Sequence, residues 1–174
     1  MNEITMGVMV MATIFALTIV LLLLFRKKTG FEIFSNLIVI NDLAYPANIP
    51  NYAIKSISMV EKLPKVMMRS NGYGGLKTWK GIFRIIGGKR ALFYVEDHFK
   101  GPLIKIETVR ESVYINFKDK EQTHQLYDEL TKNVKLLNET ELVDCKIVTT
   151  KRSWVIVGIF IAITLVIGLL PAMI

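Results

Sequence analysis

Two uncharged apolar stretches, one near each end of the chain, constrain the fold more than any other feature. The first covers residues 6–25, twenty residues without a charge or a proline, and the second covers 154–174. At about 1.5 Å of rise per residue, a helix of about twenty residues crosses the roughly 30 Å hydrocarbon layer of a bilayer. A buried core helix is equally apolar, but the intervening residues are too few to enclose two of them. The sequence therefore predicts transmembrane helices over 6–25 and 154–174.

The charges beside these stretches predict an orientation. Basic residues stand only at the inner ends, as Arg26, Lys27 and Lys28 after the first stretch and as Lys151 and Arg152 before the second. Lysine and arginine near membrane ends stay on the cytoplasmic side. A cleavable signal peptide carries its positive charge before the apolar run, where this chain has only Glu3. We therefore predict a two-span protein of the cell membrane, with both termini outside and residues 26–152 in the cytoplasm.

Small residues recur at a spacing of four in both stretches, as Ala12 and Ala16 in the first and Gly158 and Ala162 in the second. Small side chains at this spacing let the backbones of two helices approach closely. Two readings stay open: the predicted spans pack against each other, or either one docks another membrane protein.

The region between the stretches is predicted to be one domain over 31–138, followed by a linker over 139–152. Short apolar segments alternate there with turn signals, a pattern that favours strands. Seven strands are predicted, over residues 32–41, 52–60, 65–69, 79–86, 90–97, 103–109 and 111–118. Residues 42–50, which contain two prolines, are predicted to be an irregular loop, and Gly87-Gly88 a two-residue hairpin turn.

The period of the apolar residues changes after Asp119. Leu126, Leu130, Val134 and Leu137 recur at a helical spacing. The carboxylate of Asp119 suits the N-cap of this helix. We expect seven short antiparallel strands to form two near-orthogonal sheets, and the amphipathic helix to cover their open end. The predicted class is α+β.

Several short elements and their order resemble a known family. The segment Arg69-Ser70-Asn71-Gly72-Tyr73-Gly74 is similar to the R-x-N-G-x-G element of the bacterial pleckstrin-homology-like family, and Trp79-Lys80-Gly81-Ile82-Phe83 is similar to the strand that follows it. The stretches 106–108, 116–119 and 126–127 resemble the closing strand and helix of that family. The resemblance covers roughly residues 33–137. It implies a seven-stranded antiparallel β-sandwich or barrel capped by a C-terminal helix, in a membrane setting, and it carries no catalytic site over.

Side chains suited to catalysis are sparse. Glu96, Asp97 and His98 form the only acid–histidine cluster, and they lack a nucleophile and an orienting partner. Cys145 is the single cysteine, and His98 and His124 are the only histidines, so neither a disulfide nor a metal site is predicted. Residues 72–75 contain three glycines but lie between predicted strands, which favours a tight turn over a phosphate-binding loop. We therefore predict no enzyme, no cofactor and no metal.

Basic residues surround the hairpin that is predicted over 79–97. Residues 26–152 hold all 22 lysines and arginines against 14 acids, a net charge of +8. Five of these cations are candidate binding residues: Lys77, Lys80, Arg84, Lys89 and Arg90. Because side chains alternate along a strand, Lys80, Ile82 and Arg84 would share one face, opposite an apolar face with Phe83. The basic face either binds anionic head groups or an acidic partner, or is solvated and prevents edge pairing.

These features predict a non-enzymatic scaffold at the inner leaflet, which binds a protein partner or forms a homo-oligomer through its cytoplasmic domain. Two alternatives remain: recognition of anionic lipid head groups by the basic hairpin face, and a role as an accessory subunit of a membrane enzyme or transporter. Nucleic-acid binding is excluded because no recognition motif accompanies the positive charge.

Overall fold

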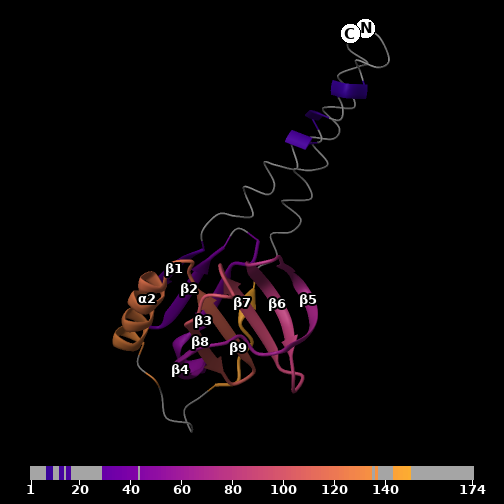
Figure 1. Cartoon of the computed structure of the whole chain (residues 1–174). Coiled ribbons are helices and arrows are strands. Elements are labelled where there is room, and N and C mark those ends of the chain that lie inside the picture. Colours follow the sequence, from indigo (N-terminus) through magenta and orange to yellow (C-terminus); the bar gives the residue numbers. More distant parts are fainter. Residues whose placement is uncertain are drawn as a thin grey trace, which may run out of the picture.

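Two β-sheets and one helix make up the domain of this computed structural model (Figure 1). The structure describes residues 7–9, 12, 13, 15, 16, 29–42, 44–134, 136 and 143–149. The smaller sheet has four strands in the order β1-β2-β3-β10, and the larger has six in the order β4-β8-β9-β7-β6-β5. In the view of Figure 1, β5 lies at one edge of the domain, while α2 lies at the other side, near β1 and β2.

The strand bounds follow the chain as β1 Gly30–Ile33, β2 Leu37–Asn41, β3 Ala47–Pro50, β4 Ile54–Val60, β5 Val66–Gly74, β6 Trp79–Ile85, β7 Arg90–Val95, β8 Leu103–Thr108, β9 Glu111–Asn116 and β10 Val148–Thr149. A short 3-10 turn, Asn51–Ala53, joins β3 to β4, and helix α2 covers Lys120–Asn133. The described residues thus form ten strands where seven were predicted.

The smaller sheet accounts for all of this difference. The single strand predicted over 32–41 is a hairpin of β1 and β2, whose turn is closed by the bond from Phe34 N–H to the Leu37 carbonyl (2.8 Å). The buried side-chain amide of Asn51 donates to the carbonyl of Ser35 (2.9 Å) and so holds that turn from a distance in sequence. The loop predicted over 42–50 contains β3, and two residues of the expected linker form β10 beside it.

The larger sheet is not wholly antiparallel, contrary to prediction. Strands β7 and β9 pair in parallel, with Leu92 opposite Val113. The chain leaves β7, forms β8 against β4, and returns as β9 between β8 and β7. The turn predicted at Gly87-Gly88 lies at the expected place but is longer than two residues. The last paired residues are Arg84 and Arg90, Gly88 N–H donates to the Ile85 carbonyl (3.0 Å), and Ile85 N–H donates to the Lys89 carbonyl (3.1 Å). Both glycines have positive φ (93° and 76°), which glycine adopts at no steric cost.

Most of the glycine-rich segment predicted as a tight turn is strand: β5 extends to Gly74, and the turn comes after it, closed by the bond from Gly75 N–H to the Thr78 carbonyl (2.9 Å). Gly72 lies in β5 opposite Gly81 in β6. A Cβ on Gly72 would come within 2.7 Å of the Lys80 carbonyl oxygen, and Gly81 has a φ of +110°. Both positions therefore require glycine because the two backbones approach too closely for a side chain.

Apolar side chains cover both faces of the larger sheet. One cluster lies between the sheets and joins Ile38 and Ile49 to Leu92 and Ile104. The other, on the opposite face, contains Phe83, Phe93, Leu103 and Tyr114, and Leu63 packs against it from the segment that joins β4 to β5. Central strands such as β7 are thus apolar on both faces, which explains their unbroken apolar sequence.

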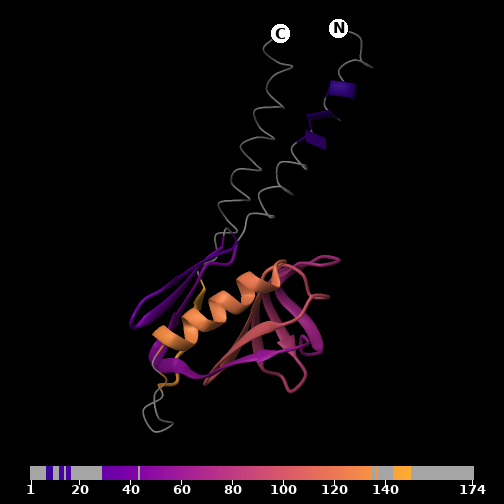
Figure 2. The same ribbon diagram turned by 60° about the vertical axis from the view of Figure 1, so that its left-hand side comes forward.

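Helix α2 closes the cluster between the sheets, as predicted. Asp119 is its N-cap, and its carboxylate accepts a hydrogen bond from Glu121 N–H (3.0 Å). Leu126, Leu130 and Val134 are buried in the cluster. Figure 2 shows α2 lying across the opening between the smaller and the larger sheet. Of the predicted apolar stripe, Leu137 lies outside the described residues.

The predicted membrane spans need correction. Among the residues that the structure describes, no helix is long and apolar enough to cross a bilayer. The predicted fold with two flanking transmembrane helices and the predicted localisation as a two-span membrane protein are therefore not supported, and the described residues form a β-rich domain with one C-terminal helix. Residues 17–25 and 154–174 of the predicted spans lie outside the described residues, as do Arg26, Lys27, Lys28, Lys151 and Arg152.

The packing of α2 yields a first prediction. Replacing the buried Leu130 with alanine should lower the free energy of unfolding by about 2–5 kcal/mol, because it leaves a cavity between helix and sheets. Leu130→Asp should unfold the domain outright, since it buries a charge without a partner. Urea denaturation measures both, with the exposed neighbour Glu129→Ala as control, which should change stability by no more than about 0.5 kcal/mol.

Candidate functional site

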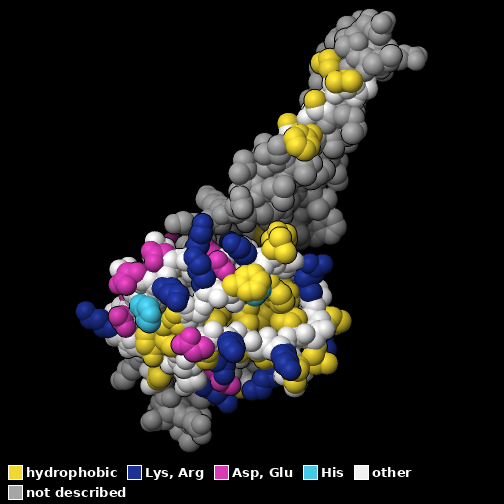
Figure 3. All heavy atoms as spheres, in the orientation of Figure 1, with side chains coloured by type: hydrophobic (Ala, Val, Ile, Leu, Met, Phe, Trp, Pro, Cys, Tyr) yellow, Lys and Arg dark blue, Asp and Glu magenta, His cyan; other side chains and the backbone are white. Residues whose placement is uncertain are grey.

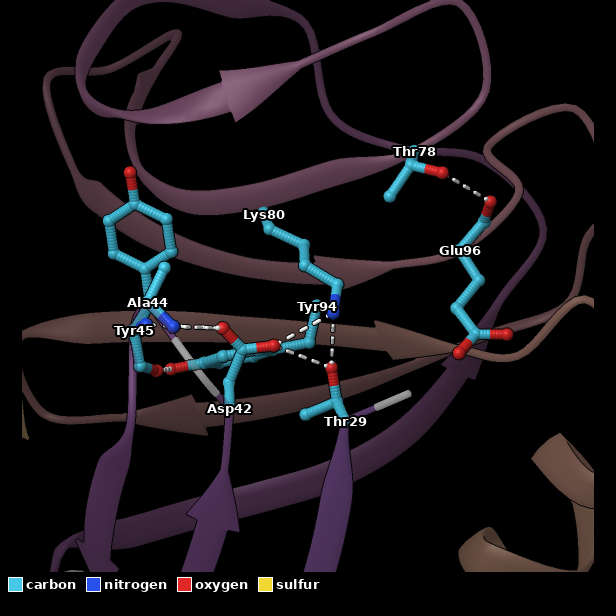
Figure 4. A network of polar contacts seen from close by, with 8 residues as sticks. All are labelled: Thr29, Asp42, Ala44, Tyr45, Thr78, Lys80, Tyr94 and Glu96. Carbon is cyan, nitrogen blue, oxygen red and sulfur yellow. Dashed lines mark hydrogen bonds and ion pairs between the residues drawn. The ribbon is translucent and has the colours of Figure 1, made fainter. Parts of the chain in front are cut away.

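A buried ion pair joins the two sheets (Figure 4). Lys80 in β6 extends toward Asp42, which follows β2, and its Nζ lies 2.8 Å from Asp42 Oδ2 and 2.9 Å from Thr29 Oγ1. Both partners are almost fully buried, with 6% of Lys80 and 5% of Asp42 exposed. Thr29 Oγ1 also donates to the same carboxylate oxygen (2.9 Å). The lysine of the larger sheet is therefore fixed by two residues that flank the β1–β2 hairpin.

The second carboxylate oxygen of Asp42 is satisfied by the backbone. It accepts hydrogen bonds from the N–H groups of Ala44 and Tyr45, both at 3.1 Å. Burial alone would raise the pKa of Asp42, but Lys80, Thr29 and the backbone bond from Tyr45 outweigh it, so that this pKa lies below its ordinary value. Tyr94 of β7 adds a further link, since its hydroxyl donates to the Tyr45 carbonyl (2.6 Å). Burial raises the pKa of Tyr94, which stays neutral.

A second charge pair lies at the other end of β7. Arg90 Nη1 is 2.5 Å from Glu111 Oε1, and its Nη2 is 3.5 Å from Thr149 Oγ1 in β10. Burial raises the pKa of Glu111 and outweighs the nearby Arg90. Arg90 thus links the larger sheet to β10 of the smaller sheet.

The five predicted binding cations do not share one surface. Lys80 is buried in the pair with Asp42, Arg90 pairs with Glu111, and the exposed Lys89 lies 3.6 Å from Glu107. Of these five cations, only Arg84 and Lys77 are exposed and form no ion pair with another described residue. The prediction of one basic hairpin face is therefore wrong, because the smaller sheet covers the face that Lys80 shares with Ile82.

One feature of the sequence indicates that Lys80 is buried. Lys80 alternates with Ile82 and lies opposite Tyr94, so that its neighbours on that face are apolar or aromatic. A lysine in such a position needs a carboxylate, and Asp42 directly follows the apolar strand β2. The pairing of Lys80 with Asp42 depends on how the two sheets pack against each other. The alternation of side chains within one strand gives no information about this packing.

The Glu96-Asp97-His98 cluster forms a structured loop. The buried side chain of Asn116 accepts from the N–H groups of Glu96 (3.0 Å) and Asp97 (3.3 Å), and donates to the carbonyls of Asp97 (2.7 Å) and Lys100 (2.8 Å). The carboxylate of Asp97 accepts from Phe99 N–H (3.1 Å). The carboxylate of Glu96 accepts from Lys118 N–H (3.2 Å), so both acids hold backbone, and His98 Nδ1 lies 2.9 Å from the Lys77 carbonyl oxygen.

Beside this loop, a surface hollow of about 350 Å³ is lined by Glu96, Lys100, Lys118, Asp119 and Gln122. Its two lysines are balanced by two carboxylates, so it has no net attraction for an anion. Across the described part of the chain, no group of three or more His, Cys, Asp or Glu side chains is placed to hold a metal ion.

Ala12 and Ala16 are helical and exposed, whereas Gly158 and Ala162 lie outside the described residues. The predicted packing of helices through these four small residues stays a prediction. Cys145 is a free thiol of intermediate exposure.

An exposed apolar and basic surface, here called the β5 rim, occurs where β5 begins and β6 ends. It consists of Lys65, Met67, Met68, Arg84 and Ile86. Met68 lies opposite Arg84 across the two strands, and Ile86 N–H donates to the Lys65 carbonyl (3.0 Å). Met67 is 67% exposed and Ile86 62%. Figure 3 shows apolar side chains gathered over the β5–β6 side of the domain, with Lys and Arg side chains around them.

The buried pair predicts a specific pattern of stability. Lys80→Met should lower the free energy of unfolding by about 3–5 kcal/mol, because it leaves the Asp42 carboxylate buried without its cation. The same change at the exposed Arg84 of the same strand should cost no more than about 0.5 kcal/mol. Adding Asp42→Asn to Lys80→Met should recover part of the loss, as urea denaturation would show. Equal losses for Lys80→Met and Arg84→Met would contradict the pairing.

The lowered pKa of Asp42 predicts an acid dependence. Its contribution to stability is fully present above the unfolded carboxyl pKa of about 3.9 and is lost as the pH falls through its lower folded value. The difference in unfolding free energy between the unmodified protein and Asp42→Asn should therefore shrink below about pH 4. Glu111, whose raised pKa acts with the opposite sign, is common to both proteins and cancels. A difference that grows on acidification would refute the assignment.

Comparison with known proteins places this arrangement in a family. The model of the bacterial PH domain matches residues 30–130, more than half of the 174 residues. No curated protein and no solved structure matches the chain. PH domains are interaction or lipid-binding modules and are generally non-catalytic. The match begins with β1 and ends within α2, so it includes every strand of both sheets except β10, and the chain belongs to the bacterial PH domain family.

Proposed function

We propose that this chain is a non-catalytic interaction module that binds an acidic segment of a partner protein through the β5 rim. The observation that carries the proposal is the exposure of three large apolar side chains, Met67 and Met68 on the edge strand β5 and Ile86 directly after the neighbouring strand β6. Apolar side chains grouped on the surface of a folded domain are typical of binding sites. Methionine suits such a site because its flexible thioether adapts to different partners.

The charge of the rim supports an acidic partner. Lys65 and Arg84 flank the apolar side chains and form no ion pair among the described residues. A carboxylate-rich segment would pair with both cations while its apolar side chains contact the methionines. A second copy of this chain would bring the same cations to the interface, and this repulsion argues against self-assembly through the rim.

The backbone of β5 favours recognition through side chains over addition of a strand. Register shifts occur between Val66 and Met68 and between Arg69 and Asn71, so that the edge is irregular at two places. Such bulges prevent the edge from pairing with an extended chain. The partner is therefore expected to contact the rim side chains rather than to extend the sheet.

Site-specific photo-crosslinking in cells tests the proposal. A benzoylphenylalanine residue replaces Met68 in one full-length variant, Ile86 in a second, and the exposed Asp128 of α2 in a control. The first two should yield adducts with the same protein, through a peptide rich in Asp and Glu, and the control should not. Lys65→Glu combined with Arg84→Glu should weaken binding of the purified partner by about tenfold or more, because it reverses both rim charges.

The charge-preserving pair Lys65→Arg with Arg84→Lys is the matched control and should bind the partner within about twofold of the unmodified chain. Adducts only with other copies of this chain would overturn the acidic partner in favour of self-assembly. Identical adducts at position 128, or binding that survives the charge reversal, would overturn the rim as the site.

A further inference from the structure

Two loops at the opposite end of the β5–β6 hairpin expose apolar side chains beside lysines. Leu76, between β5 and β6, is 91% exposed, and Phe99, between β7 and β8, is 72% exposed. Lys77 follows Leu76 and Lys100 follows Phe99, and both lysines are exposed. These four residues are here called the apolar tip.

Hydrogen bonds tie the two loops together. The Lys77 carbonyl accepts from His98 N–H (2.9 Å), and the Thr78 hydroxyl donates to the Glu96 carbonyl (3.0 Å; Figure 4). The His98 ring lies between those of Trp79 and Phe99, with ring centroids 5.7 Å and 3.9 Å away. The loops are therefore neighbours in the fold, although they are separated in sequence.

Each loop is also fixed internally. Gly75 N–H donates to the Thr78 carbonyl (2.9 Å), and Asn116 holds the Lys100 carbonyl as described above. The exposure of Leu76 and Phe99 is thus imposed by well-bonded backbone, and neither side chain gains from burial within the fold.

We propose that the apolar tip inserts Leu76 and Phe99 into the surface of an anionic lipid bilayer, with Lys77 and Lys100 at the head groups. Apolar side chains entering the interface, with cations beside them, are the arrangement by which protein surfaces bind anionic membranes. Neither lysine forms an ion pair among the described residues, so both can reach lipid phosphates, although Lys100 shares the surface hollow with the carboxylates of Glu96 and Asp119. The adjacent acid Asp97 is buried and bonded to Phe99 N–H.

The shape of the tip favours a bilayer over a protein partner. Two apolar side chains at loop ends, each followed by a lysine, can enter a bilayer surface, which needs no matching shape. The tip is also distinct from the β5 rim, because the nine residues of β5 separate the two by roughly 25 Å. The tip therefore goes beyond the proposed function and stands or falls independently of it.

A fluorescent probe at single positions tests the insertion in the full chain. In a Cys145→Ser background, an environment-sensitive fluorophore is attached through Leu76→Cys, Phe99→Cys or, as control, the exposed Asp128→Cys. Vesicles of phosphatidylcholine with phosphatidylserine should shift the emission at positions 76 and 99 to shorter wavelengths, and brominated lipids should quench it. The probe at position 128 should not respond. Each fluorophore reports only on the surroundings of the residue that carries it. Binding of the chain to vesicles through another segment would therefore not shift the emission at positions 76 and 99.

Charge variants complete the test. Lys77→Glu combined with Lys100→Glu should raise the concentration of anionic vesicles needed for the half-maximal shift by about tenfold or more, whereas Lys77→Arg with Lys100→Arg should leave it unchanged. Unchanged far-ultraviolet circular dichroism confirms that these exposed substitutions fold. Equal responses to neutral and anionic vesicles, or equal responses at positions 76, 99 and 128, would overturn the proposal. A shift caused by a purified protein and not by lipid would replace the bilayer with a protein partner.

Discussion

The ion pair between Asp42 and Lys80 fixes how the two sheets of this domain meet. A lysine ammonium buried without a partner would cost several kcal/mol, so any packing that separated it from Asp42 would be strongly unfavourable. The apolar side chains between the sheets tolerate small shifts, whereas the carboxylate, with hydrogen bonds to both oxygens, accepts one position of the lysine. The hydrophobic cluster thus supplies most of the stability, and the polar centre selects one relative placement of the sheets.

The parts of the fold that could be predicted from sequence are those determined locally. Strands β6 to β9 and the helix were predicted because each has a periodic or continuous apolar pattern of its own and is bounded by turn residues such as Gly87-Gly88. The β1–β2 hairpin was missed because its turn has no glycine or proline and is held instead by Asn51, from a later segment. The parallel pairing of β7 with β9 was missed for a related reason, since strand order depends on packing rather than on the pattern within any strand.

The candidate site was harder to predict than the fold. Alternation placed Lys80 and Arg84 on one face, and the structure agrees with that geometry. Alternation does not predict which residues of that face are covered by another element. The smaller sheet covers Lys80 but leaves Arg84 exposed to solvent. The exposed residues that do form surfaces, at the β5 rim and the apolar tip, carry no periodic signal because they lie at a bulge, at strand ends and in loops. The exposure of a side chain depends on the residues packed around it in the folded domain, so the sequence pattern alone does not identify these surfaces.

Gly72 and Gly81 allow β5 and β6 to pack closely, and the β5 rim and the apolar tip lie at opposite ends of this pair of strands. Because neither residue has a side chain, β5 can approach β6 closely enough for the Phe83 ring to pack beside Gly72. This contact holds β5, an edge strand, firmly against the sheet in spite of its two register shifts. The rim at one end of the hairpin and the tip at the other are then carried on a single rigid unit. The distance between the two surfaces is therefore set by the length of one strand, so that partners bound at both of them would be held in a fixed relation.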